Sequence, residues 1–235
     1  MTHRTDILVA DTLGDQLTAT YRARLPHVEM EGRDCPDMRP GEDTHDHGAW
    51  CGWLAGLPLE VEARANGRHT RMVFARMFDG AGKPYPNALP WLLELIRERR
   101  PRVLSFSWGA WDRDDDLVAM IHSTRYADFA RELLALCREL GITLVIASGN
   151  DDANDADDDI NQPGRSLLPD ALIVGAADRY GVPTPWSGDG KGGACVMLGK
   201  DVLSPNLRGG WSYWDGTSSC CPKVAGVAAA MALPP

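Results

Sequence analysis

The chain has 235 residues, which is long enough to bury a sizeable hydrophobic core. Its composition, 44% hydrophobic and 24% charged, is ordinary for a globular protein. The net charge of −9 argues against general nucleic-acid binding, which needs a basic surface. Because no apolar run approaches the roughly 18 residues of a membrane span, we expect neither a nucleic-acid nor a membrane partner.

The start of the chain and its cysteines indicate a cytoplasmic location. The first residues hold only a short apolar run at 7–10, whereas a secretory signal needs a longer apolar segment and a small-residue cleavage site. The six cysteines form no Cys-x-x-Cys pair and no Cys/His spacing typical of zinc. Adjacent Cys220 and Cys221 could form a strained vicinal disulfide, but cytosolic thiols ordinarily stay reduced. We expect a cytoplasmic protein that requires no cofactor and holds no metal.

Short apolar runs alternate with amphipathic stretches, a pattern typical of a parallel sheet covered by helices. A buried helix is expected to open near Trp50, and Gly141 ends another. The pattern predicts an α/β fold, a three-layer sandwich whose mostly parallel central sheet is flanked by helices. The predicted strands are 7–10, 71–76, 103–107, 142–148, 171–175 and 195–198, and the predicted helices are 89–99, 127–140 and a last one beginning near Ser218.

Two long stretches look irregular. Residues 29–46 are rich in Asp, Gly and Pro, and residues 151–169 are rich in Asp and Asn. Loops of this length inside a compact domain are usually functional. The carboxylates of the second stretch suit calcium, although their spacing does not match an EF-hand loop, so calcium there stays an open alternative. Neither a repeat nor a linker divides the chain, and we expect one domain over 1–235.

Four polar residues stand where chemistry is feasible, and each also has an ordinary structural explanation. Asp11 follows a buried strand, where active sites of α/β sheets lie but where turn and cap residues are common. His47 opens a helix, and a lone histidine there is usually structural. Asn150 follows a strand and Gly149, a common place for a turn former. Ser218 precedes the last helix, either as an N-cap or as a nucleophile near amides that stabilise negative charge.

The order and context of these residues resemble a known family. The motifs ILVADT, HGAWCGWLAG, SFSWG, IASGN and GTSSCCPKVAG follow one another as in the subtilisin-like serine peptidases, the subtilases. The resemblance covers nearly the whole chain. It implies a subtilisin-like fold, a single catalytic domain over 1–235 that is shortened at both ends, and peptidase activity.

The resemblance also implies catalytic roles. Asp11, His47 and Ser218 would form the triad, in which Ser218 attacks a peptide carbonyl and His47 takes its proton. Asp11 would orient the imidazole and stabilise its cation. The side-chain amide of Asn150 and the backbone N–H of Ser218 would hold the oxyanion.

The substrate implied by the resemblance is a peptide or protein, held as an extended strand along residues 105–109. The cleft would be lined by Ser105, Ser107, Trp108 and Gly109, although Trp108 could equally be a core residue. The segment 151–162 would form the other wall of the S1 pocket. Asn161 would lie at the pocket floor, and Asp151 at the rim would favour a basic P1 side chain.

The chain departs from the family pattern beside its key residues. The usual HGTxVAG is HGAWCGW here, with Ala49 in place of Thr and Trp53 in place of Gly. Ser219, Cys220 and Cys221 replace small residues after the nucleophile. These changes bear on the substrate range more than on the triad.

Three functions remain open at this point. The first is an endopeptidase or processing peptidase that acts through an acyl-enzyme. The second is a transpeptidase or macrocyclase of the same fold, for which the nearby Trp50, Trp53, Trp211 and Trp214 would exclude water. The third is a non-catalytic subtilase-like binding protein. A partner chain or a second copy could cover the shortened C-terminal side.

Overall fold

The computed structural model describes residues 4–13, 19–39, 45–107, 124–150, 170–188, 195–206 and 208–232. Seven strands form a parallel sheet in the order β2-β3-β1-β4-β5-β6-β7, and β8 and β9 form an antiparallel hairpin. The strands are β1 (Ile7–Asp11), β2 (Val28–Asp34), β3 (Thr70–Arg76), β4 (Val103–Phe106), β5 (Thr143–Ala147), β6 (Leu172–Ala177), β7 (Cys195–Leu198), β8 (Val202–Pro205) and β9 (Trp211–Trp214). The helices are α1 (Ala19–Arg24), α2 (Asp46–Asn66), α3 (Ala88–Arg99), α5 (Thr124–Leu140), the 3-10 turn η1 (Thr217–Ser219) and α8 (Cys221–Met231).

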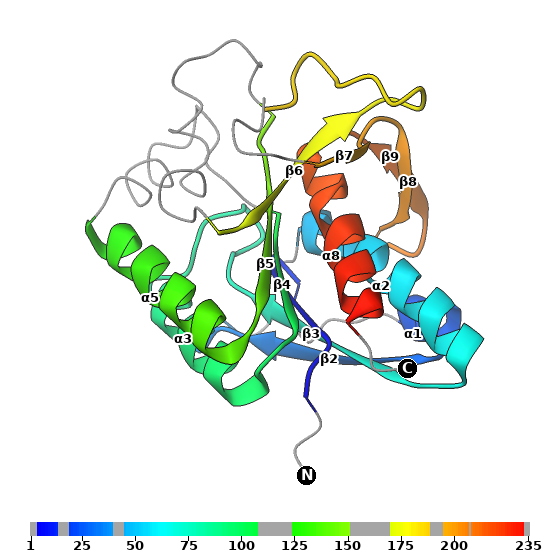
Figure 1. The fold of residues 1–235 in the computed structure, drawn as a ribbon. Helices are drawn as coiled ribbons and strands as arrows, with labels where there is room; N and C mark the ends of the chain where they lie inside the picture. Colours follow the sequence, from blue (N-terminus) through cyan, green and yellow to red (C-terminus); the bar gives the residue numbers. More distant parts are fainter. Residues whose placement is uncertain are drawn as a thin grey trace.

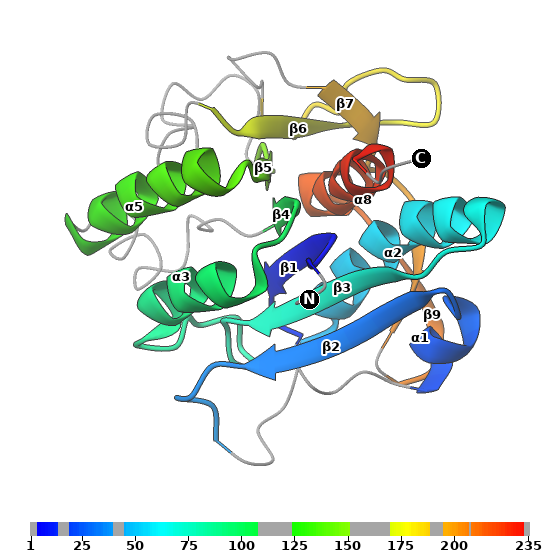
Figure 2. The same cartoon turned by 60° about the horizontal axis from the view of Figure 1, so that its bottom comes forward.

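Helices cover both faces of the sheet, as predicted. Helices α3 and α5 lie on one face, and α2 and α8 lie on the other (Figures 1 and 2). The core on the first side includes Leu92 and Phe129. The core on the second side includes Trp53 and Phe74. The predicted three-layer α/β architecture is therefore confirmed.

The central strand β1 explains why an apolar run ends in a carboxylate. All five residues of β1 are buried, because β1 pairs with β3 on one side and β4 on the other, and helices cover both faces. Asp11 is the last paired residue, opposite Arg76 of β3. The strand thus carries one acidic side chain to the carboxyl edge of the sheet, where helix α2 begins.

The expectation that residues 29–46 are irregular is wrong at its beginning. Val28–Asp34 is strand β2, which pairs in parallel with β3 at the edge of the sheet. Its sequence, VEMEGRD, lacks the β-branched run of an inner strand, because an edge strand is only partly covered and tolerates charged side chains. Helix α1 and the hairpin β8–β9 were not predicted either.

Helices α2 and α8 approach each other closely at Gly226. A Cβ atom at Gly226 would lie 2.3 Å from the backbone oxygen of Ala55 and 3.1 Å from Cγ of Pro58. Only a residue without a side chain allows this approach. Because both helices begin at the carboxyl edge of the sheet, their contact sets the spacing between the residues at their amino ends.

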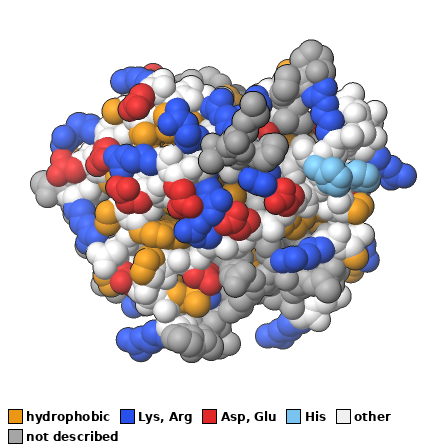
Figure 3. Space-filling view, turned by 90° about the horizontal axis from the view of Figure 1, so that it is seen from below, with side chains coloured by type: hydrophobic (Ala, Val, Ile, Leu, Met, Phe, Trp, Pro, Cys, Tyr) orange, Lys and Arg blue, Asp and Glu red, His pale blue; other side chains and the backbone are white. Residues whose placement is uncertain are grey.

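The surface carries charges of both signs. On the face in Figure 3, acidic and basic side chains are interspersed among the described residues. Ion pairs among the described residues include Arg33 with Glu98 at 3.2 Å and Arg71 with Glu29 at 3.1 Å, and exposed pairs of this kind each contribute little to stability. Among the helices that the structure describes, none combines the length and apolarity needed to cross a bilayer.

Candidate active site

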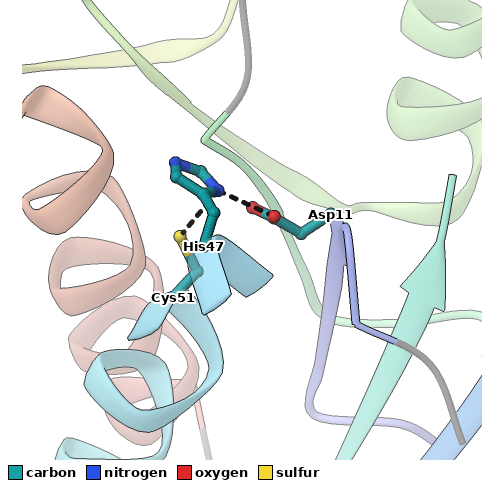
Figure 4. A group of neighbouring side chains, drawn as sticks. All are labelled: Asp11, His47 and Cys51. Carbon is teal, nitrogen blue, oxygen red and sulfur yellow. Dashed lines mark hydrogen bonds and ion pairs between the residues drawn. The ribbon is translucent and has the colours of Figure 1, made fainter. Parts of the chain in front are cut away.

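The end of β1 and the start of α2 bring a carboxylate and an imidazole together. Asp11 is 1% exposed, and His47, the second residue of α2, is 22% exposed. Nδ1 of His47 lies 2.8 Å from Oδ1 of Asp11 (Figure 4). The backbone N–H of Thr12 donates to the same oxygen at 2.7 Å. This bond orients the carboxylate toward the imidazole.

The electrostatics of the pair favour its charged form. Burial tends to raise the pKa of Asp11, but the charge and hydrogen bond of His47 outweigh burial, so this pKa is lowered. Burial tends to lower the pKa of His47, but the charge and hydrogen bond of Asp11 outweigh it, so this pKa is raised. The two directions agree. The arrangement keeps Asp11 ionised and stabilises a positive charge on His47.

Side-chain hydrogen bonds attach the first turn of α2 to the end of β1. The hydroxyl of Thr12 donates to the backbone oxygen of His45 at 2.9 Å and accepts from the N–H of Gly48 at 2.8 Å. His45 is the N-cap, and its Nδ1 accepts from the N–H of His47 at 3.1 Å. A Cβ at Gly48 would lie 2.4 Å from the backbone nitrogen of Leu13. The glycine of the HG motif is therefore required by close packing.

Ser218 lies in η1, and Cys51 contacts both its backbone and the imidazole of His47. The thiol of Cys51 donates to the backbone oxygen of Ser218 at 3.4 Å and lies 3.8 Å from Nδ1 of His47 (Figure 4). The hydroxyl of Ser218 donates to the backbone oxygen of Ser107 at 2.7 Å. Among the hydrogen bonds of the described residues, none joins Ser218 to His47. The N-cap of α8 is Cys220, so Ser218 is not the N-cap.

Asn150 and Ser218 place two hydrogen-bond donors around one space. Oδ1 of Asn150 accepts from the N–H of Thr217 at 2.8 Å and from its hydroxyl at 3.1 Å, which leaves Nδ2 as the donor. A Cβ built on Gly216 would lie 3.6 Å from Nδ2 of Asn150 and 3.7 Å from the nitrogen of Ser218. Gly216 has φ 150°, and Gly149 before the amide has φ 95°, both conformations that favour glycine. Two converging donors suit a developing oxyanion.

Two buried thiols lie near the active-site residues. Ligand atoms of Asp11, His47 and Cys51 lie within 4.8 Å of one another. Burial and the charge of Asp11 raise the pKa of Cys51 well above its usual value, and burial raises the pKa of Cys221 to about 12. Nδ1 of His47 is bonded to Asp11, so two of these three side chains are engaged with each other. All six cysteines are free, including adjacent Cys220 and Cys221.

The prediction that Ser105 lines the substrate cleft is wrong. Ser105 is 0% exposed, and its hydroxyl lies 3.6 Å from the sulfur of Cys221. Strand β4 pairs with β1 and β5 on both sides, so it has no free edge for a substrate strand before Ser107. Ser107 is buried, and its backbone oxygen accepts the hydrogen bond from the hydroxyl of Ser218. Four other predicted substrate contacts and the calcium loop lie outside the described residues: Trp108, Gly109, Asp151, Asn161 and residues 151–169.

The sequence reasoning did not predict that the ring of Trp214 and the thiol of Cys51 contact His47. The ring of Trp214 lies 5.7 Å from the imidazole between centroids, with the planes at 73°. Trp50 lies 4.6 Å from Trp214. The helical spacing of His47 and Cys51 could have indicated the thiol contact, because residues four apart share a helix face. The sequence reasoning placed Trp50 and Trp214 near the site as residues that would exclude water, but it did not predict the ring contact with His47.

Comparison with known proteins agrees with this geometry. The model of the subtilase family matches residues 33–232. A subtilisin-like protease of Coccidioides posadasii is 31% identical over an alignment 223 residues long, which covers 86% of this chain and 47% of that protein. The alkaline extracellular protease of Yarrowia lipolytica is 34% identical over a gapped alignment 245 residues long, which covers 94% of this chain and 49% of that protein. The chain thus spans about half the length of these curated relatives.

Solved structures share the fold at lower identity. A cold adapted subtilisin-like serine proteinase has a TM-score of 0.69 at 18% identity, covering 95% of this chain and 73% of that one. The prenylagaramide maturation protease PagA has a TM-score of 0.65 at 21% identity, covering 96% of this chain and 73% of that one. The family model and the identity to these relatives lead to one conclusion: the chain belongs to the subtilase family.

Proposed function

We propose that this chain is a serine peptidase that cleaves peptide bonds through an acyl-enzyme on Ser218. One observation carries the proposal. A buried carboxylate, Asp11, binds the imidazole of His47 at 2.8 Å, and Cys51 joins that imidazole to the segment of Ser218. A hydroxyl, a base and a group that orients the base are the parts that nucleophilic catalysis requires.

The first step requires a movement of the nucleophile. The hydroxyl of Ser218 donates to Ser107, so its proton must leave that carbonyl and turn to His47. A rotation about the Cα–Cβ bond of Ser218 changes the direction of the hydroxyl without moving the backbone. His47 then takes the proton as Oγ attacks the substrate carbonyl. Asp11 stabilises the resulting imidazolium, consistent with the raised pKa of His47.

The tetrahedral intermediate places its negative charge on the former carbonyl oxygen. Nδ2 of Asn150 and the N–H of Ser218 border the space beside Gly216 and would donate to this oxygen. His47 returns its proton to the leaving amine, and the acyl-enzyme forms. A water molecule then attacks the ester, with His47 again as the base, and Ser218 is regenerated.

The proposed substrate is a peptide or protein chain, cleaved at limited positions. Prenylagaramide and patellamide maturation proteases are among the structures that share this fold, which supports a processing role. The contacts of Trp214 with His47 and Trp50 favour a second candidate, transfer of the acyl group to an amine, because aromatic rings at the base limit access of water. The free thiols support our further proposal of a cytoplasmic location.

A fluorophosphonate probe tests the proposal, because it labels only an activated serine. We expect the wild-type chain to be labelled and Ser218→Ala to lose the label while keeping its circular dichroism spectrum. Ser219→Ala, which changes the neighbouring hydroxyl, should keep the label. Absence of label on folded wild-type protein would overturn the proposal and favour a peptide-binding role.

Product mass separates the two catalytic candidates. Hydrolysis adds one water to the products, whereas cyclisation or transfer to an amine adds none. A peptide library incubated with the wild-type chain, in a preparation that takes the fluorophosphonate label, should give hydrolysed fragments. Products without added water would replace peptidase by transpeptidase.

A further inference from the structure

The hairpin β8–β9 lies across the first turn of α2. Trp214, the last residue of β9, contacts the ring of His47 at 5.7 Å and the ring of Trp50 at 4.6 Å. His47 and Trp50 are three residues apart on α2, so their side chains share one face of that helix. One indole therefore touches both the base and the residue one turn below it.

Trp214 is itself held firmly. It is 9% exposed, its Nε1 donates to the hydroxyl of Ser204 at 3.2 Å, and its backbone is paired with Val202 of β8. The chain then passes from Trp214 through Gly216, whose N–H donates to the oxygen of Gly199 at 2.9 Å, to Ser218. The indole and the nucleophile thus belong to one short, anchored segment.

The imidazole of His47 needs such a support. Its side chain is 22% exposed, its ring is held by a single strong hydrogen bond to Asp11, and other staggered rotamers would carry it away from that carboxylate. Cys51 touches only the Nδ1 side, at 3.8 Å. A second wall on another side of the ring restricts the rotamer choice.

We propose that Trp214 is the positioning residue of the general base: it keeps the imidazole of His47 on Asp11 and fixes it relative to the segment that carries Ser218. The inference rests on the proposed peptidase function. Trp50 packs against Trp214 beside His47, so this aromatic contact aligns the helix of the base with the strand that leads to the nucleophile.

The proposal predicts a definite direction of change in the pKa of His47. Among the described residues, the titratable groups that face the imidazole are Asp11 from β1, Cys51 from α2 and His45 at the N-cap, whose ring centroid is 6.3 Å away. Asp11 raises the pKa of His47, and burial lowers it. If Trp214 holds the imidazole on Asp11, its removal weakens the Asp11 effect and lowers this pKa. If Trp214 merely excludes water, its removal raises this pKa.

The experiment compares Trp214→Leu with Trp214→Phe, which keeps an aromatic ring, and with Trp211→Leu. Trp211 is on the same strand but contacts Trp53, at 5.6 Å. A small fluorophosphonate probe is used, because its small size limits any direct contact between the probe and Trp214. We expect Trp214→Leu to slow labelling about ten- to a hundredfold, as for a misplaced catalytic group, and to move the acid limb of the pH profile to lower pH. Trp214→Phe should restore most of the rate.

In the control Trp211→Leu, the acid limb of the pH profile of labelling should stay at its wild-type position. An unchanged limb, or one moved to higher pH, in Trp214→Leu would overturn the inference while labelling of the wild type still supported the proposed function. If the wild type takes no label, the proposed function fails, and the ring titration of His47 followed by NMR decides the inference without activity: its pKa must fall in Trp214→Leu. If that variant does not fold, Trp50→Leu, which removes the ring packed against Trp214, should shift the same pKa in the same direction, and no shift overturns the inference.

Discussion

Adding one methyl group to Gly226 tests whether the contact of two helices sets the active site. Gly226 of α8 and Ala55 of α2 each lie eight residues after Ser218 and His47, respectively, so the contact is about two turns below both residues. A Cβ at position 226 would lie 2.3 Å from the backbone oxygen of Ala55. We expect Gly226→Ala to push the helices apart and separate the nucleophile from the base.

The magnitude follows from the distance. Ordinary contact with a Cβ begins near 3.4 Å, so the helices must separate by about 1 Å, because a backbone oxygen in a packed helix cannot rotate away. Overpacking of this kind costs about 1–3 kcal/mol, and the better helix propensity of Ala returns about 1 kcal/mol. A net loss of up to about 2 kcal/mol in the free energy of unfolding is expected. A displacement of about 1 Å at the reacting groups lowers the rate about a hundredfold.

Gly56→Ala is the matched control, because it makes the same change in α2. Its Cβ would meet the ends of two flexible side chains, Cδ1 of Leu25 at 2.7 Å and Cε of Met72 at 3.2 Å. These atoms can shift, so the control should lose little stability and little activity. Urea unfolding gives the stability, and the rate of fluorophosphonate labelling gives the activity. Equal behaviour of Gly226→Ala and Gly56→Ala in both assays would refute the reasoning.

Two further predictions concern the oxyanion donors and the base. Asn150→Asp keeps the oxygen that accepts from Thr217 but replaces the donor Nδ2. We expect the midpoint of thermal unfolding to stay near the wild-type value while kcat falls about 10²–10³-fold. A kcat near the wild-type value would exclude Nδ2 as an oxyanion donor. Asp11 raises the pKa of His47, and labelling needs the neutral imidazole, so the acid limb of the labelling rate should lie above about pH 6.5. Asp11→Asn should move this limb to lower pH. Labelling rates measured from about pH 5 to 9 give the acid limb of the wild type and of the variant, and an unmoved limb would contradict the coupling.

Local patterns were sufficient for the inner strands and the long helices. β1 was predicted to within one residue, because a strand covered on both faces is a continuous apolar run. β7 was predicted to the residue from its short apolar run, although it is an edge strand and largely exposed. Gly141, with φ 62°, ends α5 as predicted from a glycine just beyond an amphipathic stretch. The order of motifs also indicated that Asp11 and His47 meet, although they are far apart in the sequence.

Long-range packing explains what the sequence did not reveal. β2 has no apolar run because its partner is a single strand, β3, and only the sheet shows that it pairs at all. Ser105 belongs to the SFSWG motif, yet its strand pairs on both sides and its side chain points toward Cys221. Trp214 reaches His47 only because an antiparallel hairpin folds over α2. Each outcome depends on which elements become neighbours, which local periodicity does not encode.

The hydrogen bond from Ser218 to Ser107 bears on whether this arrangement can be active. The hydroxyl donates to a backbone oxygen at 2.7 Å, so the nucleophile is engaged away from the base. A neutral hydrogen bond contributes about 0.5–1.5 kcal/mol net, so breaking it slows attack by no more than about tenfold. Oxyanion stabilisation is larger, about 3–4 kcal/mol per donor. The hydrogen bond to Ser107 is therefore too weak to prevent the proposed attack by Ser218, and the engaged hydroxyl is a resting position of the proposed nucleophile.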